Sequence, residues 1–340
     1  MLLILGLISI ILLIIVLIII IIIIKGEKMN KLNKLGLTAL AGALAATSAQ
    51  AIEMSVSGGA SINFATSDSS EVTGNKMSMG DSLTFSGSGE TDQGWTVTAK
   101  IEVDGGTYDD RSVTIDMGDS GTVHVQDSGA QGTGSDLVGA AYGSASYSLV
   151  SASTTGKHVM DGLDSGAGTV NLGYTTTVAG ASIGIGYTPG GTGGKGSSTS
   201  VSVKYSDLMD GLTLAAGMSD RNTSAANGTD EMSLSASYVV GGATIGYTDF
   251  SSDDDTASGT DYDSRHYGIS FAVNDDLTIS YDKSISDKSN AAVDEETNSL
   301  QASYTMGSMT IKGHISKADN EQFSSGAEDE AKAIDVSWSF

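Results

Sequence analysis

The stretch Trp95-Thr96-Val97-Thr98-Ala99-Lys100-Ile101-Glu102-Val103 alternates apolar and polar side chains without a break. Side chains of a β-strand point alternately to its two faces, so this stretch has one apolar face and one polar face. The same period of two recurs along the chain, for example over residues 181–187 and 232–238. We find no convincing helical period beyond residue 51. The sequence therefore predicts an all-β fold of about sixteen strands.

The connections between these predicted strands alternate in length. Short connections follow the even-numbered strands, and long connections that are acidic or rich in Gly and Ser follow the odd-numbered ones. Short turns at one end and long loops at the other are typical of an up-and-down antiparallel barrel. The short connections are residues 91–94, 118–121, 178–180, 207–211, 240–242, 274–276 and 306–307, and the long ones are residues 66–80, 127–167, 189–198, 219–230, 250–263, 284–296 and 317–331.

The face of the strands that points outward indicates whether water or lipid surrounds the predicted barrel. About sixteen strands enclose a lumen too wide for side chains to fill, so water fills it. The apolar positions are often small, and the polar face is dense in Ser, Thr, Lys, Asp and Glu. With its apolar face outward, a closed barrel satisfies every backbone group inside a bilayer, where an unpaired group costs several kcal/mol. The sequence thus predicts a transmembrane β-barrel rather than a soluble sandwich.

Aromatic residues support the same interpretation. Tyrosines stand near the ends of several predicted strands, where they would form two girdles at the membrane interfaces. A general preference of Tyr for strands explains their presence but not their position at strand ends. The expected girdle residues are Tyr174, Tyr187, Tyr205, Tyr238, Tyr247, Tyr281, Tyr304 and Trp338.

The first 51 residues have a different character. Residues 1–24 are uncharged and almost wholly aliphatic, long enough for a membrane helix. Residues 29–51 contain in order the positive, apolar and small-residue regions of a signal peptide. We expect residues 29–51 to be a cleaved signal peptide and residues 52–340 to be the barrel. Residues 1–28 are expected to be spurious upstream translation, with a genuine N-terminal hydrophobic helix as the alternative.

Composition disfavours several functions. The chain is acidic, with a net charge of −24 at pH 7, so nucleic-acid binding, which needs clustered Lys and Arg, is not expected. Cysteine is absent, which removes disulfides and thiolate chemistry. The four histidines have no metal-ligand spacing. Serine is too common for any one residue to be identified as a nucleophile. We therefore expect no enzymatic activity.

Residues from Met29 to Phe340 resemble the sixteen-stranded general-diffusion porins of Gram-negative outer membranes, particularly the alphaproteobacterial type. The resemblance rests on the signal peptide, the strand number, the alternating loop lengths, the longest loop after the fifth strand and the terminal AIDVSWSF. It implies export through the periplasm and a channel for passive diffusion of small hydrophilic solutes and ions. It also implies a third loop folded into the lumen, a homotrimer, and recognition of Phe340 by the outer-membrane assembly machinery. Membrane lipids and lipopolysaccharide are the other expected partners.

The expected pore charges follow from this resemblance and from the strand period. Porins of this type face an acidic third loop with wall arginines, but beyond residue 51 this chain has only Arg111, Arg221 and Arg265. Acidic rims predict a weak cation preference. If the pore lysines cluster opposite the third loop, a substrate-specific channel for an anionic nutrient is the alternative. The expected constriction acids are Asp127, Asp136, Asp161 and Asp164, and the expected wall bases are Lys100, His124, Lys204, Lys312 and His314.

One acidic run suggests a metal ion. Asp253, Asp254 and Asp255 are consecutive, and Ca²⁺ prefers several carboxylate oxygens. We favour the alternative that the run is a solvated extracellular loop that only repels anions. An acidic calcium-binding surface or adhesion β protein is a more distant alternative, because the chain has no repeated GGxGxD turns. No other cofactor is expected.

Overall fold

The structure, a computed structural model, describes residues 53–67, 77–127, 170–190, 196–222, 228–256 and 259–340. The compact unit that contains these residues spans Ile52–Phe340. The predicted signal peptide and the segment before it lie outside the described residues, as does most of the connection after the fifth strand. Within the described residues, no helix is both long and apolar enough to cross a membrane.

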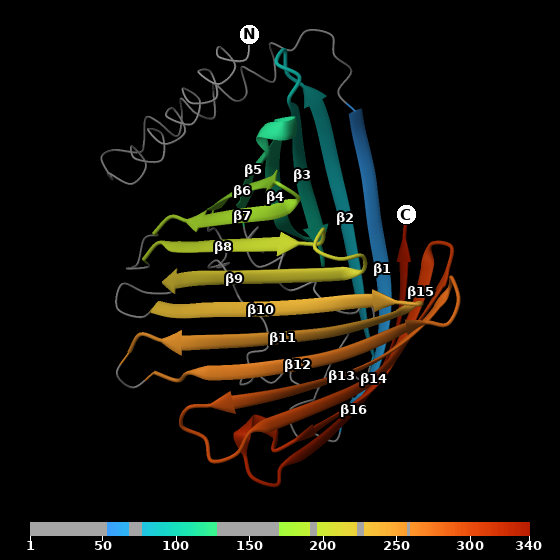
Figure 1. Cartoon of the computed structure of the whole chain (residues 1–340). Helices are drawn as coiled ribbons and strands as arrows, with labels where there is room; N and C mark the ends of the chain where they lie inside the picture. Colours follow the sequence, from blue (N-terminus) through green and yellow to red (C-terminus); the bar gives the residue numbers. More distant parts are fainter. Residues whose placement is uncertain (1–52, 68–76, 128–169, 191–195, 223–227, 257–258) are drawn as a thin grey trace. The chain divides into compact units, whose positions relative to one another are not determined.

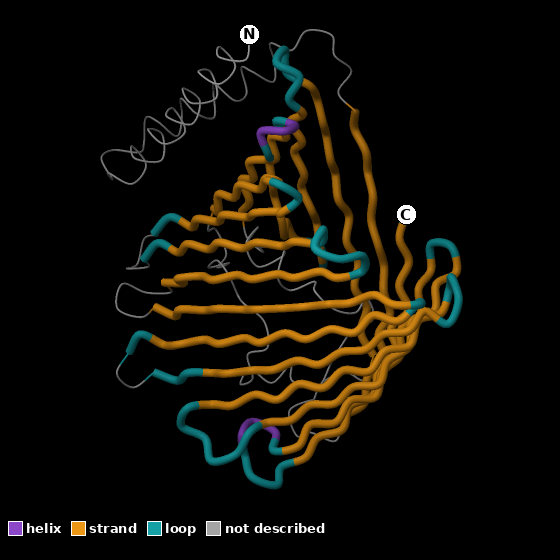
Figure 2. The backbone as a smooth tube through the Cα atoms, viewed as in Figure 1, coloured by secondary structure: helices purple, strands orange, loops and turns teal. Residues whose placement is uncertain are grey.

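Sixteen antiparallel strands form a closed barrel in which each strand pairs with its neighbours in sequence and the last pairs with the first (Figure 1). The predicted fold class and strand number are confirmed. Figure 2 shows how little of the described chain lies outside the strands. The elements are β1 (Glu53–Ser67), β2 (Met77–Glu90), β3 (Thr96–Asp104), β4 (Thr107–Asp116), η1 (Gly118–Ser120), β5 (Thr122–Asp127), β6 (Val170–Val178), β7 (Ala181–Thr188), β8 (Ser198–Tyr205), β9 (Leu212–Asn222), β10 (Gly228–Val240), β11 (Ala243–Asp254), β12 (Tyr262–Ala272), β13 (Leu277–Lys288), β14 (Glu295–Met306), β15 (Met309–Asp319), η2 (Glu321–Phe323) and β16 (Glu328–Ser339).

The seam between β1 and β16 closes the barrel. Their Cα register begins with Gly59 opposite Ser339. One step further, Gly58 N donates to Phe340 O at 2.9 Å, and Phe340 N donates to Gly58 O at 3.0 Å. The last residue of the chain therefore extends the seam. Closure leaves the described sheet without an open edge, which is the condition for placing strands in a bilayer.

The two faces of the strands have opposite polarity. On β13, for example, Ile279 and Tyr281 are exposed on the outer face, whereas Ser280 and Ser284 are buried on the inner face. Large apolar side chains cover the outside of the other strands in the same way. Among the described residues, the buried hydrophobic side chains are few and mostly small, which excludes an apolar core inside the barrel. They are Ala215, Phe250, Ala318, Phe323, Ala331 and Ala333.

The rule that long connections follow odd-numbered strands has an exception after the third strand, where no long connection was named. There β3 and β4 are joined by Gly105 and Gly106 alone. Both glycines have positive φ, 55° and 81°, a combination that allows a two-residue hairpin turn and that other residues rarely adopt. Most of the remaining connections keep the predicted alternation, but the connection of residues 206–211 after β8 is one residue longer than that of residues 223–227 after β9. We call the end of the barrel with the long connections the loop rim and the other end the turn rim.

Strand length differs around the barrel. The four strands β5 to β8 have 6, 9, 8 and 8 residues, whereas β10 has 13 and β11 and β13 have 12 each. Toward the loop rim, outward positions of the longer strands become charged, as at Asp287 of β13 and Lys317 of β15. The longer strands therefore continue past the membrane level into the loop rim.

Closure generates a prediction about Gly58. A Cβ at this position would lie 2.6 Å from Ser82 O and 2.9 Å from the Phe340 ring. We expect Gly58→Ala to destabilise the folded barrel by roughly 1–3 kcal/mol, the usual cost of overpacking. The temperature at which detergent-solubilised barrel loses its fast migration on unboiled gels measures this. Gly89→Ala on β2 is the control, because a Cβ there meets nothing within 4 Å. Equal behaviour of the two variants would contradict the prediction.

Candidate functional site

The inner wall from β8 to β16 is built largely of buried hydroxyl side chains. Antiparallel register places like residues opposite one another, as with Ser264 opposite Ser286 and Ser299 opposite Ser316. The hydroxyl oxygens of the first pair are 2.6 Å apart, and Ser316 Oγ donates to Ser299 Oγ at 2.8 Å. These hydroxyl groups are polar but uncharged, so the ionisable groups that stand among them determine the electrostatics of the wall.

All five predicted wall bases occupy inward positions in the strand register. Lys100 lies on β3, Lys204 on β8, and Lys312 on β15 opposite Asp335 of β16. His124 on β5 is partly buried, with Nε2 3.1 Å from Thr175 Oγ1. The lysines are not brought together, because each belongs to a different part of the barrel wall. His314 on β15 is buried.

The predicted constriction acids fall largely outside the described residues. Asp136, Asp161 and Asp164 belong to residues 128–169, which the structure does not describe. Asp127 is the last residue of β5, and its Cα pairs with those of Arg111 and Val170. The pore roles of these acids therefore stay predictions.

A carboxylate that the sequence reasoning missed stands on the inner wall of β13. Gln301 Nε2 of β14 donates to Asp282 Oδ1 at 2.9 Å and to Oδ2 at 3.2 Å, and lies 3.1 Å from Ser299 Oγ. Asp282 is half-buried and faces the lumen with the serines. The alternation of Leu277, Ile279 and Tyr281 already assigns position 282 to the polar face, so the period of two was the signal available for it.

Further carboxylates lie near the loop rim on the inner wall. Glu231 of β10 is buried, with Arg221 Nη2 3.7 Å from its Oε1 and Ser219 Oγ donating to its Oε2 at 3.0 Å. Glu295 at the start of β14 is also buried. Because buried carboxylates need partners, these groups fix the wall geometry as well as its charge.

The connection between β15 and β16 bends over the inner wall. Phe323 is buried against the inward residues Tyr262 of β12, with ring centroids 6.0 Å apart, and Lys288 of β13, whose Nζ is 5.5 Å from the ring. Gln322 N donates to Glu295 Oε2 at 2.7 Å. Asn320, Gln322 and Phe323 all have φ near +55°, a strained conformation for residues other than glycine. The contacts with β12 to β14 hold this strained turn in place.

Acidic residues oppose one another on the outer face of the loop rim. In the register Asp230 pairs with both Asp220 and Asp253, and Asp263 pairs with Asp287. Like charges directly opposite each other destabilise a sheet. Beside this row, burial raises the pKa of Asp294, which lies in the connection between β13 and β14, and the nearby Asp287 carboxylate raises it further.

The predicted calcium ligands do not converge on one point. Asp253 and Asp254 are consecutive in β11, so they point to opposite faces. Asp254 Oδ1 already accepts hydrogen bonds from Thr256 N at 2.8 Å and Thr256 Oγ1 at 2.6 Å. In the part of the chain that the structure describes, no group of three or more His, Cys, Asp or Glu residues is arranged to hold a metal ion. The calcium site stays a prediction.

The predicted girdle residues all occupy outward positions in the register, but not all lie at strand ends. β11 continues from Tyr247 to Asp254 and β13 from Tyr281 to Lys288, because these strands extend into the loop rim. Tyr267 of β12 was missed; its ring centroid is 5.2 Å from that of Tyr247. The other outward residues are Tyr174 on β6, Tyr187 on β7, Tyr205 on β8, Tyr238 on β10, Tyr304 on β14 and Trp338 on β16.

A closed sixteen-stranded barrel with an apolar outside and a hydroxyl-rich inside is now established. A family model described as Gram-negative porin matches residues 36–340. The chain belongs to the Gram-negative porin family. A comparison with curated proteins gives no match. Membership and fold place this porin in the outer membrane of a Gram-negative bacterium and make it a diffusion channel rather than an enzyme, as the sequence predicted.

Solved structures share the fold at low sequence identity. The anion-selective porin from Comamonas acidovorans aligns with a TM-score of 0.65 and 16% identity, covering 85% of this chain and 100% of that one. A mutant of the Rh. blastica porin aligns with a TM-score of 0.63 and 16% identity, covering 85% of this chain and 100% of that one. A loop-deleted OmpT, an outer membrane protein of Vibrio cholerae, aligns with a TM-score of 0.64 and 13% identity, covering 86% of this chain and 100% of that one. At such identities the similarity shows the fold alone, so the ion preference of this porin is argued from its own residues.

The strained turn at Phe323 leads to a prediction about conductance through the channel mouth. Phe323→Ala removes the ring that packs on Tyr262 and Lys288, so the turn should leave the inner wall. We expect a larger single-channel conductance, or more frequent steps between levels, in planar bilayers. Phe85→Ala, on the outer face of β2, is the control and should conduct as the unaltered protein does. Unchanged conductance in Phe323→Ala would show that the turn does not narrow the mouth.

The acidic row predicts a stabilising substitution. Asp230→Asn removes two opposed like-charge pairs, and we expect the barrel to gain roughly 0.5–1 kcal/mol of stability at low salt. The gain should fade at about 1 M salt, where the Debye length falls to about 3 Å. Unfolding in detergent by urea measures both values. Asp92→Asn, in the turn between β2 and β3, serves as the control. A gain that is independent of salt would contradict the electrostatic explanation.

Proposed function

We propose that this porin is a general diffusion channel for small hydrophilic solutes and ions with a weak preference for cations. The observation that supports the preference is the distribution of inward charge. Lysines are single and dispersed on the inner wall, whereas carboxylates are frequent on it and at its mouth. A lumen of this kind concentrates cations and depletes anions near its wall. The inward carboxylates include Glu102, Asp254, Asp282, Glu295, Asp329 and Asp335.

The second candidate is a substrate-specific channel for an anionic nutrient. It would be favoured if Lys100, Lys204 and Lys312 formed one cluster. In strand order β16, β1 and β2 separate Lys312 from Lys100, and β4 to β7 separate Lys100 from Lys204. This dispersal favours the cation-preferring channel. Family membership leaves no support for the surface or adhesion protein.

Further parts of the proposal rest on family membership. We propose that the connection after β5 folds into the lumen and contributes acids to the constriction, and that three barrels associate. Contact with lipopolysaccharide and recognition of Phe340 by the assembly machinery belong to the same proposal. The place of Phe340 in the closing seam is consistent with a role in assembly, because a chain that lacks it also lacks a backbone pair with β1.

Planar-bilayer recording on protein refolded from residue 52 onward tests the proposal. We expect stepwise conductance in groups of three and a reversal potential of cationic sign in a salt gradient. The potential should shrink at about 1 M salt, because screening confines the wall charges to about 3 Å. A reversal potential of anionic sign would favour the anion-specific channel instead.

The inward carboxylate of Asp282 leads to a prediction about the size of the cation preference. Asp282→Asn keeps the shape of the side chain but removes a lumen-facing charge. A unit charge at about 4 Å in water is worth about 1 kcal/mol, so the cation-to-anion permeability ratio should fall, by at most about fivefold. Reversal potentials at pH 8 measure the ratio. Asp287→Asn is the matched control, because Asp287 lies on the outer face of the same strand. An equal effect of the two substitutions would exclude Asp282 as a selectivity determinant.

A further inference from the structure

The inner wall lacks side chains on one flank of Asp282. In the register Asp282 of β13 pairs with Gly268 of β12, which in turn pairs with Gly246 of β11. Both glycines are inward residues, because they alternate with the exposed outward residues Ile269 and Ile245. Neither glycine has a positive φ, so the backbone does not require glycine at these positions. At the two register positions next to the carboxylate, the wall is therefore bare backbone.

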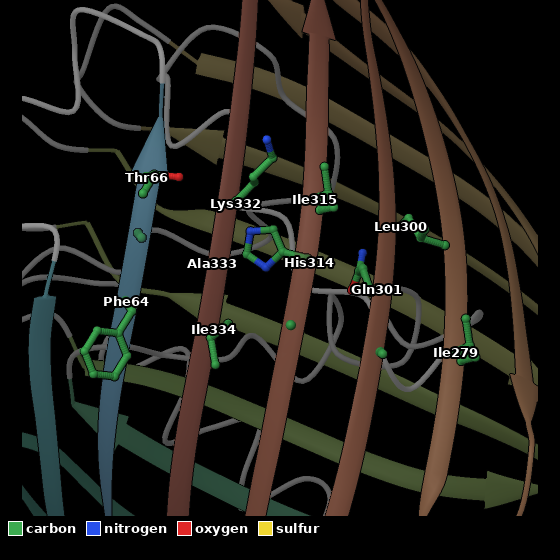
Figure 3. Close-up of a pocket in the computed structure, with 13 residues that line it drawn as sticks. Phe64, Thr66, Ile279, Leu300, Gln301, His314, Ile315, Lys332, Ala333 and Ile334 are labelled. Atoms are coloured by element: carbon green, nitrogen blue, oxygen red, sulfur yellow. The ribbon is translucent and has the colours of Figure 1, made fainter.

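The other flank of Asp282 is occupied by Gln301 of β14. Gln301 Nε2 donates to Asp282 Oδ1 at 2.9 Å, to Asp282 Oδ2 at 3.2 Å and to Ser299 Oγ at 3.1 Å. Gln301 pairs with His314 of β15 in the register, and Figure 3 shows these two side chains on their neighbouring strands. Contact with both carboxylate oxygens occupies the edge at which a guanidinium group binds in bidentate fashion. The remaining lone pairs of the two oxygens stay available.

Asp282 also differs from other inward carboxylates in its lack of a basic partner. None of the ion pairs formed by the described residues includes Asp282. By contrast, Glu231 lies 3.7 Å from Arg221 Nη2, and Asp335 pairs with Lys312 in the register. The negative charge of Asp282 is therefore held by hydrogen bonds alone and can attract a cation from the lumen.

A buried hydroxyl group stands on the same face of the strand. Ser280 lies two residues before Asp282 on β13 and is 6% exposed. Among the described residues, Ser280 Oγ has no hydrogen-bond partner. A buried hydroxyl without a partner costs free energy, so a ligand that donates a hydrogen bond to it gains stability. Two residues on one face of a strand are about 7 Å apart, so one nitrogen between the two side chains can reach both.

These features determine the chemistry of a ligand. The carboxylate favours a cation, and the hydroxyl favours a cation with more than one N–H donor. A primary ammonium group has three donors and binds a carboxylate as a point charge. A guanidinium group needs the bidentate edge that Gln301 occupies. A divalent metal ion prefers several carboxylate oxygens, and the described residues place no group of three or more metal-ligating side chains together.

We propose that Asp282 and Ser280 form a binding site on the lumen wall for the primary ammonium group of a solute. Gln301 positions the carboxylate, and the two inward glycines leave the wall beside it free of side chains. This inference rests on the proposed diffusion channel and adds a class of solute, small amines that enter the lumen. The field of a charged wall acts alike on all monovalent cations, whereas a hydrogen-bonding site distinguishes them.

Reduction of the potassium current by added cations in planar bilayers tests the site. The probes are the chlorides of ethylammonium, guanidinium and tetramethylammonium, at pH 8, where the inward His266 and His314 are largely neutral. We expect ethylammonium to reduce the current saturably and at the lowest concentration. Asp282→Asn should raise its half-maximal concentration by about tenfold and Ser280→Ala by about threefold, the factors for losing a charged and a neutral hydrogen bond.

Two further variants separate binding from structural effects. Asp287→Asn, on the outer face of the same strand, is the matched control and should leave the half-maximal concentration unchanged. Gln301→Ala frees the bidentate edge and should shift the preference from ethylammonium toward guanidinium, which loss of packing alone would not do. Heat-modifiable migration shows that each variant has folded. Saturation-transfer NMR of ethylammonium with the detergent-solubilised barrel measures the same affinities without conduction.

Two results would overturn the site. One is an equal effect of Asp282→Asn and Asp287→Asn on ethylammonium, by current or by NMR. The other is an equal affinity of the unaltered barrel for the three probes, which would mean that only the wall field acts. An unchanged preference in Gln301→Ala would remove the positioning role of Gln301. A reversal potential of anionic sign in potassium chloride alone would instead contradict the proposed cation preference, and the NMR affinities would still decide the site.

Discussion

Closure of the sheet is the constraint on which the rest of this structure depends. Water is absent from the hydrocarbon region, so every backbone N–H and C=O group there must be paired within the protein. The pairing of β1 with β16, extended by Gly58 and Phe340, removes the two edges that sixteen strands would otherwise leave. Once the sheet is closed, alternation along each strand separates an apolar outside from a polar inside. The apolar outside and polar inside, the reverse of a water-soluble protein, are therefore a consequence of closing the sheet in a lipid bilayer.

The polar inside explains why hydroxyl residues are so frequent in the sequence. Serine and threonine fill inward positions with small side chains that satisfy one another across strands, as Ser264 and Ser286 do. Such a wall has little charge of its own. The ionisable residues among these hydroxyls therefore determine the local field, because the hydroxyls carry no charge and the lumen is confined. Asp282, held by Gln301, is one such residue on the inner wall.

Most of the fold could be predicted from the sequence, because a period of two and the length of each connection are local properties. Inward or outward position follows from the same period, and the strand register places Lys100, Lys204 and Lys312 on the face opposite to the apolar residues. Contacts across strands could not be predicted, because they depend on register, which is set by the geometry of each turn. The Asp282–Gln301 pair and the fold of the turn around Phe323 both depend on residues that are distant in sequence. The two-residue turn at Gly105 and Gly106 departs from the general length rule, because two consecutive glycines with positive φ close the hairpin directly.

The difference in strand length has a consequence for the surrounding bilayer. With a rise of about 3.3 Å per residue and a tilt of about 40°, the 8 residues of β7 or β8 span about 20 Å of membrane depth, whereas the 13 residues of β10 span about 33 Å. An outward apolar band of about 25 Å fits the long strands but exceeds the short ones. The lipids beside β6 to β8 must shorten to match the wall, at a cost of a fraction of a kcal/mol per Å. Two barrels that meet along these strands would share a single thinned region instead of maintaining two, so membrane elasticity alone favours contact on this side.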